Sequence, residues 1–176
     1  MRRFSLGAAF QLRNRRFQGL SGFEGKPFHP PLTDVPVGAY VVAPILDVVA
    51  LIGRERPWGH DLHVAAGYSL LVGACFSALT ILTGFADWWR MRPGSEVRRI
   101  TNAHMLVMIT TTLLVAADLA VRFGGDSRVT NGGVLALSLG VLVLVTLGGA
   151  IGGSLVFDKG YKVRARMSPP PQPGGD

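Results

Sequence analysis

The side chains of this chain that could do chemistry are a few histidines and aspartates placed in or beside long apolar stretches. An ionisable group inside a membrane is costly, so each one predicts either a pairing partner or a functional site. Their positions along the apolar stretches fall into two layers. The inner layer consists of His29, Asp34, Asp87 and His104, and the outer layer consists of Asp47, His63 and Asp118.

The inner layer is the candidate cofactor site. His29 and His104 are expected at a similar depth, and two histidines on facing segments of a four-helix bundle are the minimum for a b-type haem. A quinone needs less, because one His or Asp beside an apolar groove can hydrogen-bond to it. In a purely structural interpretation, His29 bonds a carboxylate such as Asp34 or Asp87. The two prolines after His29 are expected to keep it outside the helix, and Thr33 or Asp34 to cap the helix that follows.

The outer layer allows two further hypotheses. Asp47 and Asp118 could belong to a proton or ion path in a small transporter. Each half of the chain has a His near the start and an Asp late in its first apolar stretch, which hints at a parallel duplication. Alternatively, the polar layers are hydrogen-bonding contacts between helices in a membrane anchor or assembly module. Asp118 returns to nearly the same helical face as His104, so one face of that helix carries both.

Other function classes are excluded by what the chain lacks. Its single cysteine, Cys75, cannot form an internal disulfide, and it cannot hold a zinc ion or an iron–sulfur cluster alone. The sequence has no phosphate loop, nucleophile elbow or zinc-protease helix. The net charge of +7 comes from short basic clusters beside apolar segments, which does not indicate nucleic-acid binding. We therefore expect no catalytic residues, no bare metal site and no nucleic-acid partner.

The elements that must position these side chains are four apolar stretches, at residues 34–53, 64–86, 100–121 and 133–157. Each has the ~20 residues that a helix needs to cross the hydrocarbon of a bilayer. The second and fourth show no polar face of the kind that a soluble bundle requires. The sequence thus predicts an all-α integral membrane protein, an up-down bundle of four transmembrane helices in a domain at 29–163. A basic N-terminal segment at 1–28 precedes it, and a disordered tail rich in proline and glycine at 164–176 follows it.

The distribution of positive charge predicts the orientation. Fourteen of the 18 lysines and arginines fall on the side that holds the N-terminal segment, the second loop and the C-terminal tail. The other side holds only Arg54, Arg56, Arg122 and Arg128. By the positive-inside rule both termini are cytoplasmic. We expect a multi-pass protein of the bacterial inner membrane.

A set of short motifs resembles a known bacterial family. They are His29-Pro30, residues 32–38, Gly84 with Asp87-Trp88, Arg98-Arg99 before His104, and residues 152–156. Together they look like the membrane-protein family catalogued as domain of unknown function 2231, over about residues 25–163. Met108 and Ser154 depart from its pattern, because relatives often carry Asn and His there.

The resemblance implies a four-helix membrane module. Some members of the family are fused to a Rieske-type ferredoxin domain, which implies an association with electron transfer. The leading hypothesis is therefore a subunit of membrane electron transfer that contacts quinone or haem b. Its expected partners are the lipid bilayer and either a membrane or redox protein or further copies of itself.

Overall fold

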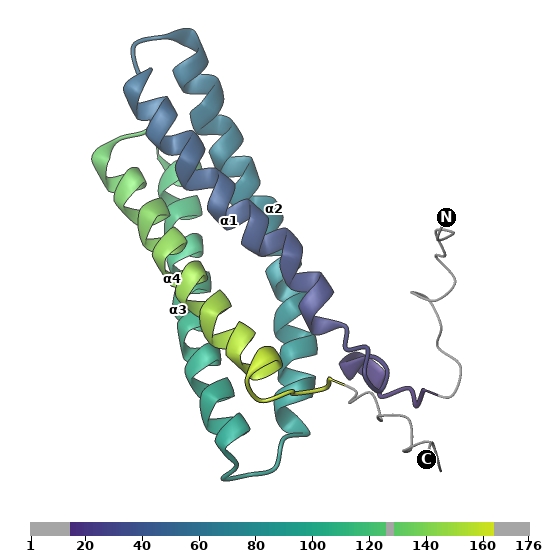
Figure 1. The fold of residues 1–176 in the computed structure, drawn as a ribbon. Helices are drawn as coiled ribbons and strands as arrows, with labels where there is room; N and C mark the ends of the chain where they lie inside the picture. The colour runs from purple at the N-terminus through teal and green to yellow at the C-terminus, as the bar shows by residue number, and fades with distance from the viewer. Residues whose placement is uncertain (1–14, 126–128, 164–176) are drawn as a thin grey trace, which may run out of the picture.

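The structure, a computed structural model, describes residues 15–125 and 129–163, and these contain helices and no β-strand. A short 3-10 helix, η1 (Gly19–Ser21), precedes four long helices (Figure 1). The long helices are α1 (His29–Ile52), α2 (Pro57–Trp89), α3 (Glu96–Gly124) and α4 (Gly132–Phe157). All four are long and apolar enough to cross a membrane. The expected tail at 164–176 and the first half of the expected N-terminal segment lie outside the described residues.

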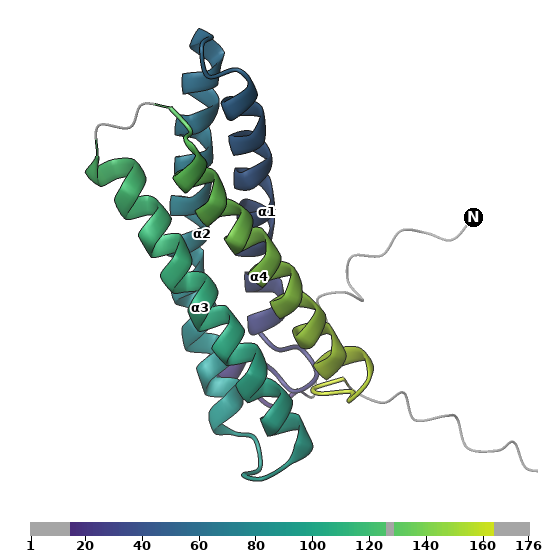
Figure 2. The same ribbon diagram turned by 90° about the vertical axis from the view of Figure 1, so that its left-hand side faces the viewer.

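The four helices form two antiparallel hairpins that lie side by side (Figures 1 and 2). One hairpin is α1 with α2 and the other is α3 with α4, and α1 also packs along α4 while α2 packs along α3. Helices α1 and α3 are therefore diagonal neighbours across the bundle. Because the directions alternate, α1 begins and α4 ends at the same end, which we call the inner end.

Every helix is longer than its apolar stretch, because a helix continues past the hydrocarbon into a zone where polar side chains are satisfied. The largest consequence is at α1, which begins at His29 instead of residue 34. Pro30 and Pro31 occupy its first turn, where a missing N–H costs nothing. The prediction that these prolines keep His29 outside the helix is therefore wrong. Thr33 is not a cap either, because its hydroxyl bonds the Pro30 carbonyl at 2.6 Å.

Of the other three helices, α3 and α4 begin at a side-chain cap and α2 does not. Helix α2 begins at Pro57, seven residues before the apolar stretch predicted at 64. Helix α3 begins one residue after Ser95, whose Oγ accepts a hydrogen bond from the Arg98 N–H at 3.3 Å. Asn131 caps α4 in the same way through the Val134 N–H at 3.0 Å. Side-chain oxygens at these positions satisfy N–H groups that have no partner within the helix.

Glycines set how closely the helices of one hairpin approach. Tyr40 is fully buried in α1, and a Cβ placed on Gly73 of α2 would lie 2.6 Å from its ring. The Tyr40 hydroxyl lies 2.9 Å from Ser77 Oγ, so the phenol is satisfied without water. In the other hairpin a Cβ on Gly148 would lie 2.5 Å from Met108 Sδ. Only hydrogen at these positions allows the side chain opposite to fit.

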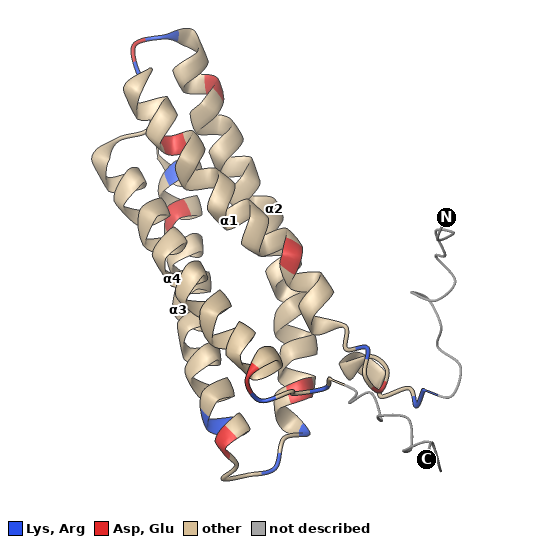
Figure 3. Ribbon diagram, viewed as in Figure 1, with Lys and Arg blue, Asp and Glu red and all other residues tan. Residues whose placement is uncertain are grey.

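Apolar side chains cover the outside of the bundle along its length. Leu106, Leu113 and Val143 each expose about two thirds of their surface. Figure 3 shows the same division, with charged residues at the two ends and uncharged helix between them, apart from a few charges in the middle of the bundle. An outer surface of this kind is suited to lipid rather than water.

At the inner end, the segment after α4 contacts both the end of α2 and the segment before α1. Lys162, just after α4, donates to Asp87 Oδ1 at 2.6 Å and to the Ser21 carbonyl at 3.1 Å. The Tyr161 hydroxyl donates to the Asp87 carbonyl at 3.3 Å. Burial, with a smaller contribution from Asp87, raises the pKa of Tyr161 to about 12. Residues of the N-terminal segment thus pack against the bundle and are tied to the end of α4.

Candidate functional site

The first half of the inner site is built by α1 and α2 around His29. The Nδ1 of His29 lies 3.0 Å from the Thr80 carbonyl oxygen. Gly84, one turn after Thr80, leaves that carbonyl uncovered, and a Cβ there would lie 2.9 Å from His29 Cε1. A side chain on a helix leans toward the preceding turn, so only glycine lets the imidazole reach this carbonyl.

The second half is built in the same way by α3 and α4 around His104. Its Nδ1 lies 2.9 Å from the Gly148 carbonyl oxygen. Gly152 is again one turn further along, and a Cβ on it would lie 3.2 Å from His104 Cε1. Each hairpin therefore presents one imidazole, held by a carbonyl and resting on a glycine of the next helix.

These contacts fix the tautomer of both rings. A carbonyl oxygen can only accept a hydrogen bond, so each Nδ1 carries the proton and donates it. In the neutral ring the Nε2 then has a lone pair. No hydrogen bond to the Nε2 of His29 or His104 occurs among the described residues. In metal sites, a histidine ligand is commonly oriented in this way. One ring nitrogen donates its N–H to a backbone carbonyl, and the other nitrogen binds the metal.

The two rings meet across the diagonal of the bundle. Their centroids are 6.4 Å apart and their planes cross at 88°. Within the part of the chain that the structure describes, no group of three or more His, Cys, Asp or Glu could hold a metal ion. The pair can therefore serve a metal only if the metal brings its remaining ligands with it.

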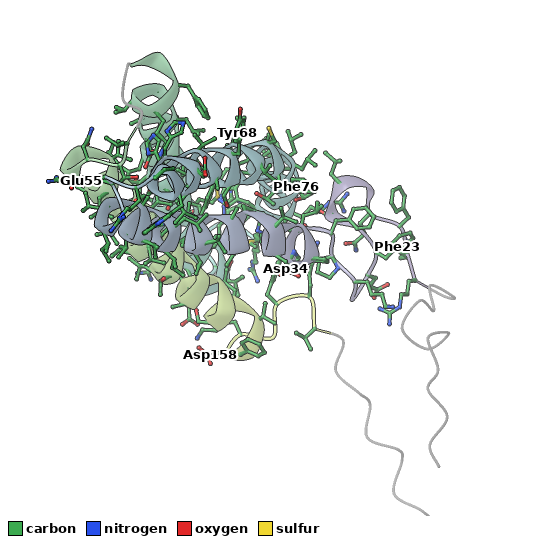
Figure 4. All side chains as sticks on the ribbon, turned by 90° about the horizontal axis from the view of Figure 1, so that it is seen from above. Phe23, Asp34, Glu55, Tyr68, Phe76 and Asp158 are labelled. Atoms are coloured by element: carbon green, nitrogen blue, oxygen red, sulfur yellow. The ribbon has the colours of Figure 1, made fainter. Side chains whose placement is uncertain are left out.

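The other inner-layer residues lie elsewhere. Asp34 is on the exposed surface of α1 (Figure 4) and contributes nothing to the histidine pair. Asp87 is buried, but its carboxylate is bound by Lys162. The interpretation that His29 bonds Asp34 or Asp87 is wrong, since the Thr80 carbonyl takes that position. The sequence placed Asp34 in the site because its first apolar stretch begins at residue 34. Helix α1 begins at His29, and Asp34 lies on its exposed face.

The outer layer is a buried cluster centred on Arg122 of α3, which we call the outer cluster. Its Nε donates to Asp118 Oδ1, its Nη2 donates to Asp47 Oδ2 of α1, and its Nη1 donates to the His63 carbonyl of α2 at 3.2 Å. Thr130, after α3, donates from its hydroxyl to Asp47 Oδ1 at 3.1 Å. The side chains of Arg122 and the two aspartates expose 1% of their surface or less, so these bonds are shielded from solvent.

Arg122 and Thr130 were missed in the sequence because the third apolar stretch was ended at residue 121. Arg122 was then counted among the loop arginines of the outer side. The structure continues α3 to Gly124 and buries Arg122 between helices. The signal was present, because Asp118 and Arg122 stand one helical turn apart, the spacing of a helix ion pair.

The two sites reveal how the hairpins correspond. Asp47 follows His29 at the same distance along the chain as Arg122 follows His104, and both pairs meet in the bundle. The equal spacing matches Asp47 with Arg122, whereas the duplication expected from the sequence matched Asp47 with Asp118. That duplication stays a prediction. The histidine pair and the Asp47–Arg122 pair each join matching positions of α1 and α3.

The outer cluster generates a stability prediction. Replacing Arg122 with Gln leaves two buried carboxylates without their cation, and breaking a buried ion pair from one side costs about 3–5 kcal/mol. We expect a clearly lower midpoint of thermal unfolding in detergent for Arg122→Gln. Arg54→Gln, an exposed arginine toward the same end of the bundle, is the matched control and keeps the wild-type midpoint. Equal midpoints for the two variants would contradict the pairing.

Comparison with known proteins agrees with the motifs found in the sequence. A family model described as a predicted membrane protein, DUF2231, matches residues 25–165 and so covers all four helices. No curated protein and no solved structure matches the chain. The resemblance drawn from the motifs is confirmed. The chain belongs to the family of predicted membrane proteins catalogued as domain of unknown function 2231.

Proposed function

We propose that the protein is a subunit of membrane electron transfer in which His29 and His104 hold one b-type haem between them. The observation that carries this proposal is the opposed pair of imidazoles with matching tautomers. Each ring has its Nδ1 occupied by a backbone carbonyl and its Nε2 left with a lone pair, and the rings belong to diagonal helices. Histidines of facing helices are the usual haem ligands in four-helix bundles.

The spacing of the rings supports a shared metal. A ring nitrogen lies roughly 1 Å from the ring centroid, and a metal–imidazole bond is about 2 Å long. Two imidazoles whose Nε2 atoms face one metal from opposite sides therefore have centroids about 6 Å apart. The observed separation of 6.4 Å is compatible with that arrangement. Two protein nitrogens are too few for a bare ion, whereas haem iron has four ligands of its own. The donor set thus fits haem and does not fit a zinc or copper site.

The chain's own residues have defined tasks in this proposal. Haem, when bound, supplies one-electron chemistry. The carbonyls of Thr80 and Gly148 fix the tautomer and direction of the two rings. Gly84 of α2 and Gly152 of α4 let the rings lie against the surface of the second helix of each hairpin. Both histidines are half-buried, and the degree of burial is one of the means by which proteins set a haem potential.

We further propose that the protein lies in the bacterial inner membrane with both termini cytoplasmic. The charge asymmetry supports this orientation more strongly once Arg122 is seen to be buried, because it no longer counts as a loop charge. We expect a reporter fused within the loop at residues 90–95 to act inside the cell and one fused at Arg56 to act outside. The reverse result would invert the orientation while leaving the helices unchanged.

The haem proposal is tested by the visible spectrum of the full chain purified in detergent from haem-replete cells. We expect b-type bands that sharpen on reduction with dithionite. His29→Ala and His104→Ala should each lose most of the bound haem, because one imidazole holds b-type haem weakly. Added imidazole should restore part of the spectrum in either variant, since it replaces the missing ring.

His60→Ala is the matched control, because His60 is an exposed histidine near the start of α2. It should keep the wild-type spectrum. Circular dichroism of all variants separates loss of haem from loss of fold. A wild-type protein without haem bands, or single-histidine variants with wild-type haem content, would contradict the proposal. Quinone in the lipid extract of a haem-free wild-type protein would favour the quinone version of the redox hypothesis instead.

A further inference from the structure

The outer cluster has more negative than positive side chains. Asp47 and Asp118 face a single guanidinium, that of Arg122, and all three side chains are buried. With both carboxyl groups ionised, the cluster would carry a net negative charge in the interior of a membrane protein. An unbalanced charge there is far more costly than a neutral, hydrogen-bonded group.

No other described group that faces the cluster offers a fixed positive charge. Helix α1 contributes Asp47, α2 contributes His63, and α3 contributes Asp118 and Arg122. Helix α4 has no titratable side chain between Gly132 and Phe157. Neutrality is therefore reached most simply by one added positive charge, and a proton is the smallest that can be added.

The hydrogen bonds indicate which carboxyl group takes it. Both oxygens of Asp47 accept hydrogen bonds, Oδ1 from Thr130 and Oδ2 from Arg122. Only Oδ1 of Asp118 does so, and its Oδ2 is buried without a partner. An unbonded oxygen of an ionised carboxylate carries charge into the interior, whereas a proton on that oxygen makes the group neutral and much less costly to bury.

A chain of hydrogen bonds joins His63 to Asp47 through Thr130. The Thr130 hydroxyl donates its proton to Asp47 Oδ1. In its contact with His63 Nδ1 at 3.0 Å it must therefore be the acceptor. His63 Nδ1 therefore carries a proton, and its approach to Arg122 Nη1 at 3.4 Å is a contact between two donors. Both bonds of this chain point toward Asp47, which Arg122 joins to Asp118, so His63 and Thr130 can pass a proton into the cluster at Asp47.

We propose that the outer cluster is a proton-binding site, in which the Asp118 carboxyl holds one exchangeable proton and Arg122 links it to the hydrogen-bonded chain of Asp47, Thr130 and His63. The site is independent of the haem proposal, since it uses other residues at the other end of the helices. It differs from a plain salt-bridge cluster, in which both aspartates are permanently ionised.

Infrared spectroscopy of the detergent-solubilised wild-type chain tests this directly, because a protonated carboxyl has a carbonyl stretch that an ionised carboxylate lacks. We expect this band at neutral pH, with an isotope shift in protein labelled with ¹³C-aspartate and a further shift in D₂O. Asp118→Asn should remove the band and keep or raise the midpoint of thermal unfolding, because a neutral amide replaces a neutral acid. Asp34→Asn, an exposed aspartate of α1, should change neither.

A second variant tests the relay and does not depend on the folding of Asp118→Asn. His63→Gln can still donate to Thr130 but cannot pass a proton on, so the hydrogen–deuterium exchange of the band should be slower by an order of magnitude or more. Absence of a protonated-aspartate band at neutral pH would overturn the proposal. Loss of the band on adding Na⁺ or K⁺ at constant pH would also overturn it, because the site would then bind a metal cation in place of the proton.

Discussion

A polar group inside a bilayer must find its partner within the protein, and this constraint decides how the four helices are joined. Arg122 satisfies it in three directions, toward Asp118 on its own helix, Asp47 of α1 and the backbone of α2. Its donors therefore fix the register of both hairpins at one end. The hydrophobic effect cannot do this, because lipid is as apolar as the helix surfaces themselves.

The same constraint acts at the inner end through weaker bonds. There each histidine takes a carbonyl of the other helix in its hairpin, and a glycine makes that carbonyl reachable. Between the two ends the phenol of Tyr40 meets Ser77 in an otherwise apolar core. An apolar core thus separates the polar groups into two sites. The inner site holds the imidazoles of His29 and His104, and the outer cluster holds Arg122 with two aspartates.

Both sites join matching positions of the diagonal helices α1 and α3. His29 and His104 offer a ligand the same group from two sides. Asp47 and Arg122, at the matching positions further along the two helices, carry opposite charges and form an internal ion pair. The equal spacing therefore places a pair of like residues at one end of the bundle and a pair of opposite charges at the other.

The sequence was sufficient for the number and approximate position of the helices, because apolar length is the property that a bilayer selects. It also named both histidines of the inner pair and both aspartates of the outer cluster. It failed where a helix continues beyond its apolar stretch. That error left His29 outside α1, assigned Arg122 to a loop and placed Asp34 in the site. The roles of Thr80, Gly84, Gly148 and Gly152 depend on contacts between helices, which no spacing within one helix shows.

The central claim is that two perpendicular imidazoles share one metal centre, and electron paramagnetic resonance of the oxidised protein tests it most directly. Ferric haem held by both imidazoles would be low-spin, and ring planes that cross at 88°, as those of His29 and His104 do, would make its signal strongly anisotropic. We predict such a signal for the wild-type chain and its replacement by a high-spin signal, or by none, in His104→Ala. A high-spin ferric signal from the wild-type chain, or no haem signal at all, would contradict the claim.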